Sequence, residues 1–514
     1  MVPSEDLFSL IKSLSKSEKG HFKKYASKHV IGEQNHYIKI FDAIERQKEY
    51  DEQALKEEFK DESFLNSFAP FKVYLFNLIL KSLTVYHADK SADAYLNRTL
   101  LNTEILFKKG IYKPALKHLI KAKSIAYHYE KFDTLLSLID WEKRIILLGT
   151  FETKIIQMIN KLLPERENIL KLIHNIYEYE SLAVRSNKLV TTSDRTRNKE
   201  DLKNIKSFLS EPLLSDERKA LSDTARFFHH NVCSFLHFEA GNLNQSYKFC
   251  KKNVLLMEQH PDRIKEYPIR YLATLQNLLV FETKQNKLKE ANLILNKARK
   301  AASESEGEIK NIEVKTFEWT GTSELIMLIN ACEFDKAQQL VPQIALKLNE
   351  FSDKIDKAYE FVFRYYISYL YFILGKFDKA KSWLDPVVNA GKSETRQDII
   401  SFSLILNLLL HFEKGNALVL EYFGKSANRY MIKKNTLNKL ESLLLNFVYK
   451  KLPRLDNGSP ELKKACLDLR EQVNEVLKDP FEQKALSYFD INAWIESQIS
   501  GKKIVDVIKP KTSN

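Results

Sequence analysis

Gly375-Lys-Phe377-Asp-Lys-Ala380 is one copy of a six-residue pattern that recurs along this chain. The other copies, in chain order, are Gly110-Ile-Tyr112-Lys-Pro-Ala115, Gly149-Thr-Phe151-Glu-Thr-Lys154, Gly241-Asn-Leu243-Asn-Gln-Ser246, Asn286-Lys-Leu288-Lys-Glu-Ala291 and Cys332-Glu-Phe334-Asp-Lys-Ala337. Their starts are 39, 92, 45, 46 and 43 residues apart, and 92 is twice 46. A period in this range indicates stacked supersecondary units of one kind.

The pattern has the features of a turn between two helices. Glycine at its start suits the positive φ angle at a helix C-terminus, and Asn286 is the next-best residue for that angle. Small and apolar residues then follow at helical spacing, and they predict the face that packs inside each helix pair. These residues are Ala115, Leu119 and Ala122; Ala291, Leu295 and Ala298; Ala337, Val341 and Ile344; and Ala380, Leu384 and Val387.

On these residues the chain resembles the tetratricopeptide-repeat family. That family has Gly-x-[Tyr/Phe]-x-x-Ala between its two helices and another alanine seven residues later, as Gly110, Tyr112, Ala115 and Ala122 do here. The resemblance is degenerate, because the period is about 39–46 residues rather than about 34. It covers roughly residues 92–430. It implies a right-handed superhelical solenoid of stacked antiparallel helix pairs.

Composition favours long helices with short connections. Among 514 residues there are only 13 glycines and 13 prolines, while 44% of residues are hydrophobic. Few turn-forming residues and ample apolar content together indicate an ordered, all-α chain. The net charge is +13, and because lysines alternate with acidic residues, we interpret it as a well-solvated helix surface.

We expect four segments along the chain. Residues 1–90 form an N-terminal helical cap domain, in which Ser15-Lys-Ser-Glu18 has the form of a capping box. Residues 91–435 form the tetratricopeptide-like solenoid, and residues 436–500 form C-terminal capping helices. The basic stretch 501–514 is expected to be a flexible tail.

The sequence also predicts a compartment. The four cysteines form neither a disulfide framework nor a CxxC pair, which favours a reducing environment. The first residues lack a cationic start and an apolar core typical of a signal peptide. The apolar stretch Ser403–Phe412 is too short to span a bilayer. We therefore expect a cytoplasmic protein without membrane insertion.

One cluster has metal-ligating residue types. His229, Cys233 and His237 are spaced four residues apart and would share a helix face, with Cys250 as a further zinc ligand. In the repeat register, however, Cys233, His237 and Cys250 occupy positions that are apolar or aromatic in other units. We therefore interpret them as core residues and predict no metal and no other cofactor.

No catalytic motif lies in a suitable context. The chain lacks HExxH, a P-loop, GxSxG and a GxGxxG between a strand and a helix. Carboxylates brought together only by folding would leave no motif, so that class of site stays open on sequence grounds. The prediction is a non-enzymatic protein.

Two binding surfaces compete. The N-terminal lysines Lys12, Lys16, Lys19, Lys23, Lys24 and Lys28 form a basic face that would suit the phosphates of a nucleic acid. The resemblance instead implies a concave surface lined by the first helix of each pair. In this register the candidate partner-binding residues are Asn231, Phe235, Gln276, Trp319, Tyr365 and Tyr369.

Aromatic and amide side chains together suit a peptide or a partner helix. The function predicted from sequence is thus a non-enzymatic, protein- or peptide-binding scaffold or regulator. The alternative is a nucleic-acid-associated regulator that uses the lysine-rich N-terminal helix.

Overall fold

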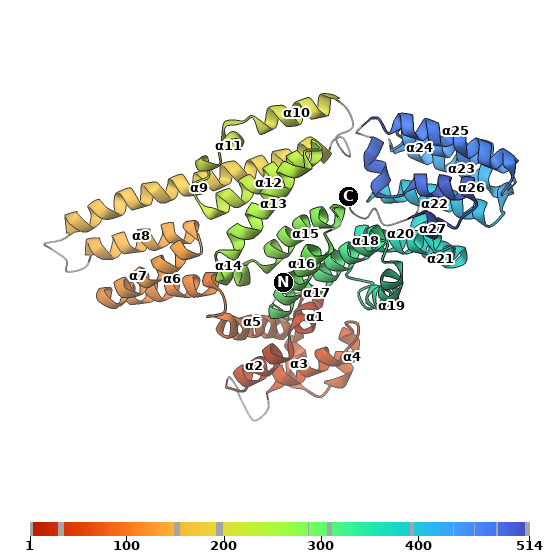
Figure 1. The fold of residues 1–514 in the computed structure, drawn as a ribbon. Helices are drawn as coiled ribbons and strands as arrows, with labels where there is room; N and C mark the ends of the chain where they lie inside the picture. The colour runs from red at the N-terminus through yellow and green to blue at the C-terminus, as the bar shows by residue number, and fades with distance from the viewer. Residues whose placement is uncertain are drawn as a thin grey trace. The chain divides into compact units, whose positions relative to one another are not determined.

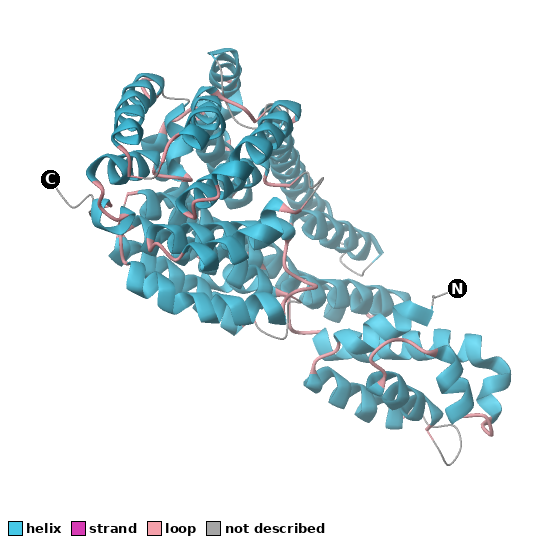
Figure 2. Ribbon diagram, turned by 90° about the vertical axis from the view of Figure 1, so that its right-hand side faces the viewer, coloured by secondary structure: helices cyan, strands magenta, loops and turns pink. Residues whose placement is uncertain are grey.

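The protein is all-α within the residues that the structure describes (Figures 1 and 2). This structure is a computed structural model, and it describes residues 4–28, 35–148, 155–191, 199–285, 287–305, 311–390, 395–434, 436–456, 458–479 and 482–508. Every element in these ranges is a helix. The all-α class predicted from the sequence is therefore confirmed.

The chain divides into two compact units. Unit 1 contains residues 1–181 and 217–228, and unit 2 contains residues 182–216 and 229–514. Two of the three boundaries fall inside helices, α9 (Ile155–Thr191) and α12 (Asp223–Glu239), and the third lies after Asp216. The boundary expected near residue 90 is not a boundary between these units, although the residues before it have a hydrophobic core of their own.

Unit 1 begins with the segment predicted as a cap. Its helices are α1 (Ser4–Ser13), α2 (Lys16–Ser27), α3 (His36–Arg46), α4 (Glu52–Glu58) and α5 (Phe68–His87). The predicted capping box is present, with Ser15 and Glu18 each accepting the other's backbone N–H. Glu18 and His21 on α2 also reach α5, where they contact His87 (2.6 Å) and Ser82 (3.0 Å). These bonds and the rings of Phe22 and Phe41 hold the cap together.

One stretch of the described residues, Phe64–His87, is long and apolar enough to cross a membrane by length and composition alone. It differs from Ser403–Phe412, the apolar stretch picked out from the sequence, and contains two lysines, Lys72 and Lys81. In this structure α5 packs on α1 and α2. Leu75 and Ile79 are fully buried, and Lys72 pairs with Glu52 at 2.5 Å.

The first repeated turn lies in the rest of unit 1. Helices α6 (Ala92–Lys108) and α7 (Tyr112–His128) pack together across Gly110, whose φ is +70°. Helix α8 (Phe132–Leu148) packs on α7, and α9 follows it. The predicted turn Gly149–Lys154 lies outside the described residues.

Unit 2 contains the remaining helices. Beyond the shared α9 and α12 they are α10 (Lys199–Leu209), α11 (Pro212–Ser215), α13 (Leu243–Glu258), α14 (Pro261–Glu266), α15 (Pro268–Lys284), α16 (Leu288–Glu304), α17 (Ile312–Thr316), α18 (Thr322–Asn330), α19 (Phe334–Glu350), α20 (Lys357–Ile373), α21 (Phe377–Val388), α22 (Gln397–Glu413), α23 (Ala417–Lys433), α24 (Lys439–Asn446), α25 (Pro460–Val476), α26 (Ile491–Ser500) and α27 (Ile504–Val507). A π-helical turn, Phe317–Gly321, joins α17 to α18.

The described turns of the six-residue pattern in unit 2 have the backbone angle expected at a helix end. Gly241, Cys332 and Gly375 have positive φ, between +60° and +78°, and so does Gly415 in the turn between α22 and α23. Asn286 lies outside the described residues. All twelve residues predicted to line the inner faces of the helix pairs are at most 4% exposed, so their burial is confirmed.

The C-terminal region differs from the prediction in two places. Within the predicted capping helices of residues 436–500, Glu482–Ser487 is a 3-10 turn, followed by α26, whose first turn is capped by the Asp490 side chain. The tail expected to be flexible from residue 501 includes α27, and its Ile504 is buried in the main core of unit 2. Apolar contact with α26 orders this short segment, which local composition does not reveal.

Candidate functional site

The six predicted site residues fall into different environments in unit 2. Asn231 and Phe235 line a cavity of about 320 Å³. Gln276 and Trp319 are half-buried between helices. Tyr365 and Tyr369 are buried, at 0% and 7% exposed, so the prediction that they are exposed to a partner is wrong. Of the six, only Asn231 and Phe235 therefore line this cavity.

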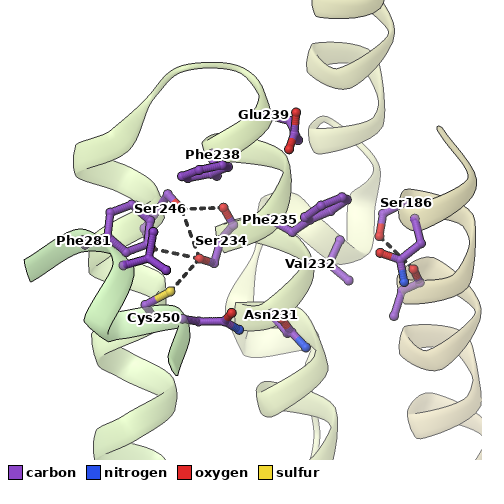
Figure 3. A pocket seen from close by; sticks show the side chains of 14 residues that line it. Ser186, Asn231, Val232, Ser234, Phe235, Phe238, Glu239, Ser246, Cys250 and Phe281 are labelled. Carbon is purple, nitrogen blue, oxygen red and sulfur yellow. Dashed lines mark hydrogen bonds between the residues drawn. The ribbon is translucent and has the colours of Figure 1, made fainter. Parts of the chain in front are cut away.

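The cavity is formed by four helices of unit 2. It lies between the end of α9 and helices α12, α13 and α15, and Figure 3 shows its side chains. The lining residues are Ala183, Ser186, Asn187, Asn231, Val232, Ser234, Phe235, Phe238, Glu239, Ser246, Cys250, Asn277, Val280 and Phe281. Its volume and mixed lining are in the range of ligand-binding pockets.

Small polar side chains hold α12 and α13 close together at the inner end of the cavity. The Ser246 hydroxyl donates to the Ser234 carbonyl at 2.6 Å, and the two hydroxyl oxygens are 3.1 Å apart. The Cys250 sulfur lies 2.9 Å from the Ser234 hydroxyl (Figure 3). Burial raises the pKa of the Cys250 thiol to about 11, so this thiol is protonated and unreactive near neutral pH.

Aromatic rings form the apolar part of the lining. Phe238 and Phe281 meet edge to face, with their ring centres 5.8 Å apart. Phe235 points from α12 toward the α9 segment that carries Ser186, as Figure 3 shows. Phe235 is only half-buried. An apolar side chain of a ligand would therefore gain contact area against this ring.

Three amide side chains approach the cavity from three helices. Asn187 belongs to α9, Asn231 to α12 and Asn277 to α15. Asn187 and Asn277 are exposed, and Asn231 is half-buried. None of the three amide groups has a hydrogen-bond partner among the described residues. Each therefore retains both a donor and an acceptor for a ligand.

Four lining residues were not predicted from the sequence: Asn187, Asn277, Phe238 and Phe281. Gln276 was predicted instead, because it precedes the turn at Asn286 by as many residues as Asn231 precedes the turn at Gly241. In the structure the next residue, Asn277, lines the cavity, while the Gln276 side chain accepts a hydrogen bond from Ser323 at 3.2 Å. A one-residue change of position rotates a side chain by about 100° around a helix axis, and repeat alignment does not resolve this.

The suspected zinc ligands do not converge. Cys233 lies 3.9 Å from His229, whose ring is also 3.1 Å from the Leu214 carbonyl. His237 stacks on Phe249 instead, and Cys250 contacts Ser234. Within the described residues no three histidine, cysteine or acidic side chains form a metal-binding group. These residues are packed in the helix interface, as the repeat register suggests.

Tyr365 and Tyr369 are covered by a distant part of the chain. The Tyr365 hydroxyl donates to the Tyr488 carbonyl at 3.1 Å, and the Tyr369 hydroxyl accepts the Asp490 backbone N–H at 3.1 Å. Phe489 packs against Tyr369 with ring centres 5.5 Å apart. Residues 488–490 thus cover the two tyrosines that were predicted to contact a partner.

A second cavity of unit 2, about 540 Å³, lies between α16, the α17–α18 region and α19. Its floor is apolar, with Phe317 and Ile344. Two of its charged groups are already paired within the chain, Arg299 with Glu324 and Lys347 with Glu350. It therefore offers fewer groups for polar recognition than the cavity at Asn231.

The lysines proposed for phosphate binding are partly neutralised. Lys12 donates to the Glu45 carbonyl at 2.7 Å, while Lys19 pairs with the Glu45 carboxylate at 3.0 Å and Lys23 with Asp42 at 2.6 Å. The other three lysines, at positions 16, 24 and 28, are exposed. This arrangement weakens the basic surface on which the nucleic-acid alternative depends.

Comparison with protein-family models and with curated proteins finds no match to this chain.

Proposed function

We propose that this protein binds a segment of another polypeptide in the cavity of unit 2 around Asn231 and Phe235, and that it does so without catalysis. The carrying observation is the placement of three amide side chains, on α9, α12 and α15, around an aromatic surface. An amide presents a donor and an acceptor together, which matches the alternation of N–H and C=O along a peptide backbone.

The aromatic residues supply the second half of recognition. Phe235 is half-buried, and a ligand side chain placed beside it would contact an apolar wall that continues to Phe238 and Phe281. Binding energy in such interfaces concentrates on one or two apolar anchors, with polar contacts fixing orientation. A peptide with one large apolar residue therefore fits this cavity better than a uniformly charged chain.

The helix pairs are proposed to stack as a right-handed superhelical solenoid, similar to tetratricopeptide repeats. Support comes from the positive φ angles of the described turns and from the small buried residues after them. Small-angle scattering of the full-length protein tests this part. A solenoid gives a radius of gyration well above that of a compact globule of equal length, and a compact value would contradict the arrangement.

A random-peptide display selection on the full-length protein tests the binding proposal. The selected peptides should share an apolar anchor position, and Asn231→Ala combined with Phe235→Ala should weaken their binding at least about tenfold. Arg299→Ala in the second cavity serves as a matched control and should retain binding. Peptides that bind both variants equally, or a selection without enrichment, would overturn the proposal.

A further inference from the structure

The exposed side of α9 carries a regular line of large apolar residues within unit 1. Ile156, Leu163, Leu170 and Tyr177 are spaced seven residues apart. Their side chains are 75%, 48%, 46% and 54% exposed. Apart from Pro164, the other exposed residues between them are polar. The line, here called the α9 stripe, is therefore a narrow apolar feature on a polar helix surface.

The spacing of the α9 stripe indicates the shape of what would cover it. Positions seven residues apart drift by only ~20° around a straight helix, so the stripe stays on one face for about 32 Å. Two helices that cross at a shallow angle meet along such a line. A flat surface would require a broader set of exposed apolar positions.

The charges beside the stripe are self-complementary about Leu170. In an antiparallel pair related by a two-fold axis at Leu170, Leu163 of one copy lies opposite Tyr177 of the other. Both polar residues that flank Leu170 on one side, Glu167 and His174, are exposed. They lie three residues before and four residues after it, so Glu167 of each copy approaches His174 of the other, whose ring is also 3.7 Å from Glu178 of its own helix.

We propose that two copies of this chain associate through their α9 stripes as an antiparallel helix pair centred on Leu170. The symmetry is isologous, as in most homodimers, so each favourable contact occurs twice. Pro164 interrupts the backbone hydrogen bonds of α9. The central contact, Leu170 against Leu170 of the other copy, uses the helix after that interruption. The exposed Lys171 lies on the same side and within one turn of Glu167 of the second copy, which gives each copy a charged pair across the axis.

Sedimentation equilibrium of the full-length protein tests the association. The parent chain should be a dimer, and Leu170→Glu should raise the dissociation constant at least about tenfold, because it places two carboxylates at the axis. Leu101→Glu on α6 is the matched control. Leu101 is also an exposed leucine of unit 1 (57%), and its variant should remain dimeric. A monomeric parent chain, or a Leu170→Glu variant that dimerises as before, overturns the proposal.

Disulfide cross-linking provides a second measurement that does not depend on a disruptive charge. Cys233, Cys250 and Cys466 are buried, and Cys332→Gly removes the remaining cysteine at a position where other turns have glycine. In that background, Leu163→Cys mixed with Tyr177→Cys should form a covalent heterodimer upon oxidation, while neither variant should form one alone. Cross-linking of each variant with itself, or none in the mixture, overturns the antiparallel pairing.

Discussion

Two regions of unit 2 have similar sequences but differ in exposure: one lines an open cavity, and the other is covered by the chain itself. Near Phe235, on α12, the aromatic ring lines an open cavity. Near Tyr369, at the corresponding part of α20, the rings are sealed under residues 488–490. The repeat register assigned both to one binding surface. The comparison shows that an aromatic residue on the first helix of a pair becomes either an anchor or a core residue, depending on whether the chain itself covers it.

The cover over Tyr369 is well supported by hydrogen bonds. Tyr488 makes a further hydrogen bond, from its hydroxyl to Asp398 at 2.8 Å. In the helix that follows, the Trp494 indole donates to Glu413 at 2.8 Å. Trp494 is 1% exposed. A segment with this many buried contacts belongs to the folded core and is not a displaceable lid.

The largest expected effect is in the sealed region. Ala380 is fully buried between α20 and α21. Ala380→Glu would place an uncompensated charge there and should lower the free energy of unfolding by about 4 kcal/mol. Urea unfolding followed by circular dichroism measures it, with the exposed neighbour Lys379→Glu as control. An unchanged urea midpoint would show that the helix interface lies elsewhere.

Tyr369→Ala should lower the free energy of unfolding by about 3 kcal/mol, because it removes a buried ring and leaves the Asp490 N–H without an acceptor. The same urea titration measures it. Tyr369→Phe, which keeps the ring, should lose less. If Tyr369→Ala kept full stability and abolished peptide binding, the sealed region would be a binding surface after all.

Phe235→Ala should separate binding from folding. Because Phe235 is half-buried, the loss in unfolding free energy should be about 1 kcal/mol, clearly below that of Tyr369→Ala. Binding of the selected peptides should nevertheless fall at least about tenfold. Equal loss of stability in the two variants would remove the distinction between the open and the sealed region.

The smallest effect concerns Glu413, whose carboxylate accepts hydrogen bonds from α26. Burial raises the pKa of this carboxyl group, while hydrogen bonds from Trp494 and Gln498 lower it in part. A pKa raised by folding means that the charged form destabilises the native state at pH values above the folded pKa. Glu413→Gln retains an oxygen for both donors and should therefore stabilise the protein slightly at neutral pH.

The sign can be checked by repeating the urea titration at several pH values. The advantage of Glu413→Gln should be greatest above the folded pKa. It should shrink as the pH falls through that value and vanish below the unfolded pKa, near 4.5. A variant that is less stable than the parent at neutral pH would show that the charged carboxylate contributes more through hydrogen bonding than it costs by burial.

The sequence by itself determined the helical class, the described turns and the inner faces of the helix pairs. These follow from local physics, since glycine or a substitute adopts positive φ at a helix end, and small residues at helical spacing allow helices to pack closely. Gly375 and Ala380 illustrate both points. Asn231 and Phe235, predicted from their place before a repeated turn, line the cavity, while their role in binding stays a prediction.

Only the tertiary structure decided which of those faces stay open. The segment that covers Tyr369 lies 121 residues later in the chain. It lies in the region predicted to form capping helices, yet residues 488–490 connect the 3-10 turn Glu482–Ser487 to α26, and Phe489 contacts the rings of Tyr369 and Phe372. Likewise, Asn187, Asn231 and Asn277 come from helices far apart in sequence and meet only through packing. Repeat spacing records how each unit folds, whereas burial of a given surface depends on contacts between residues that no local pattern links.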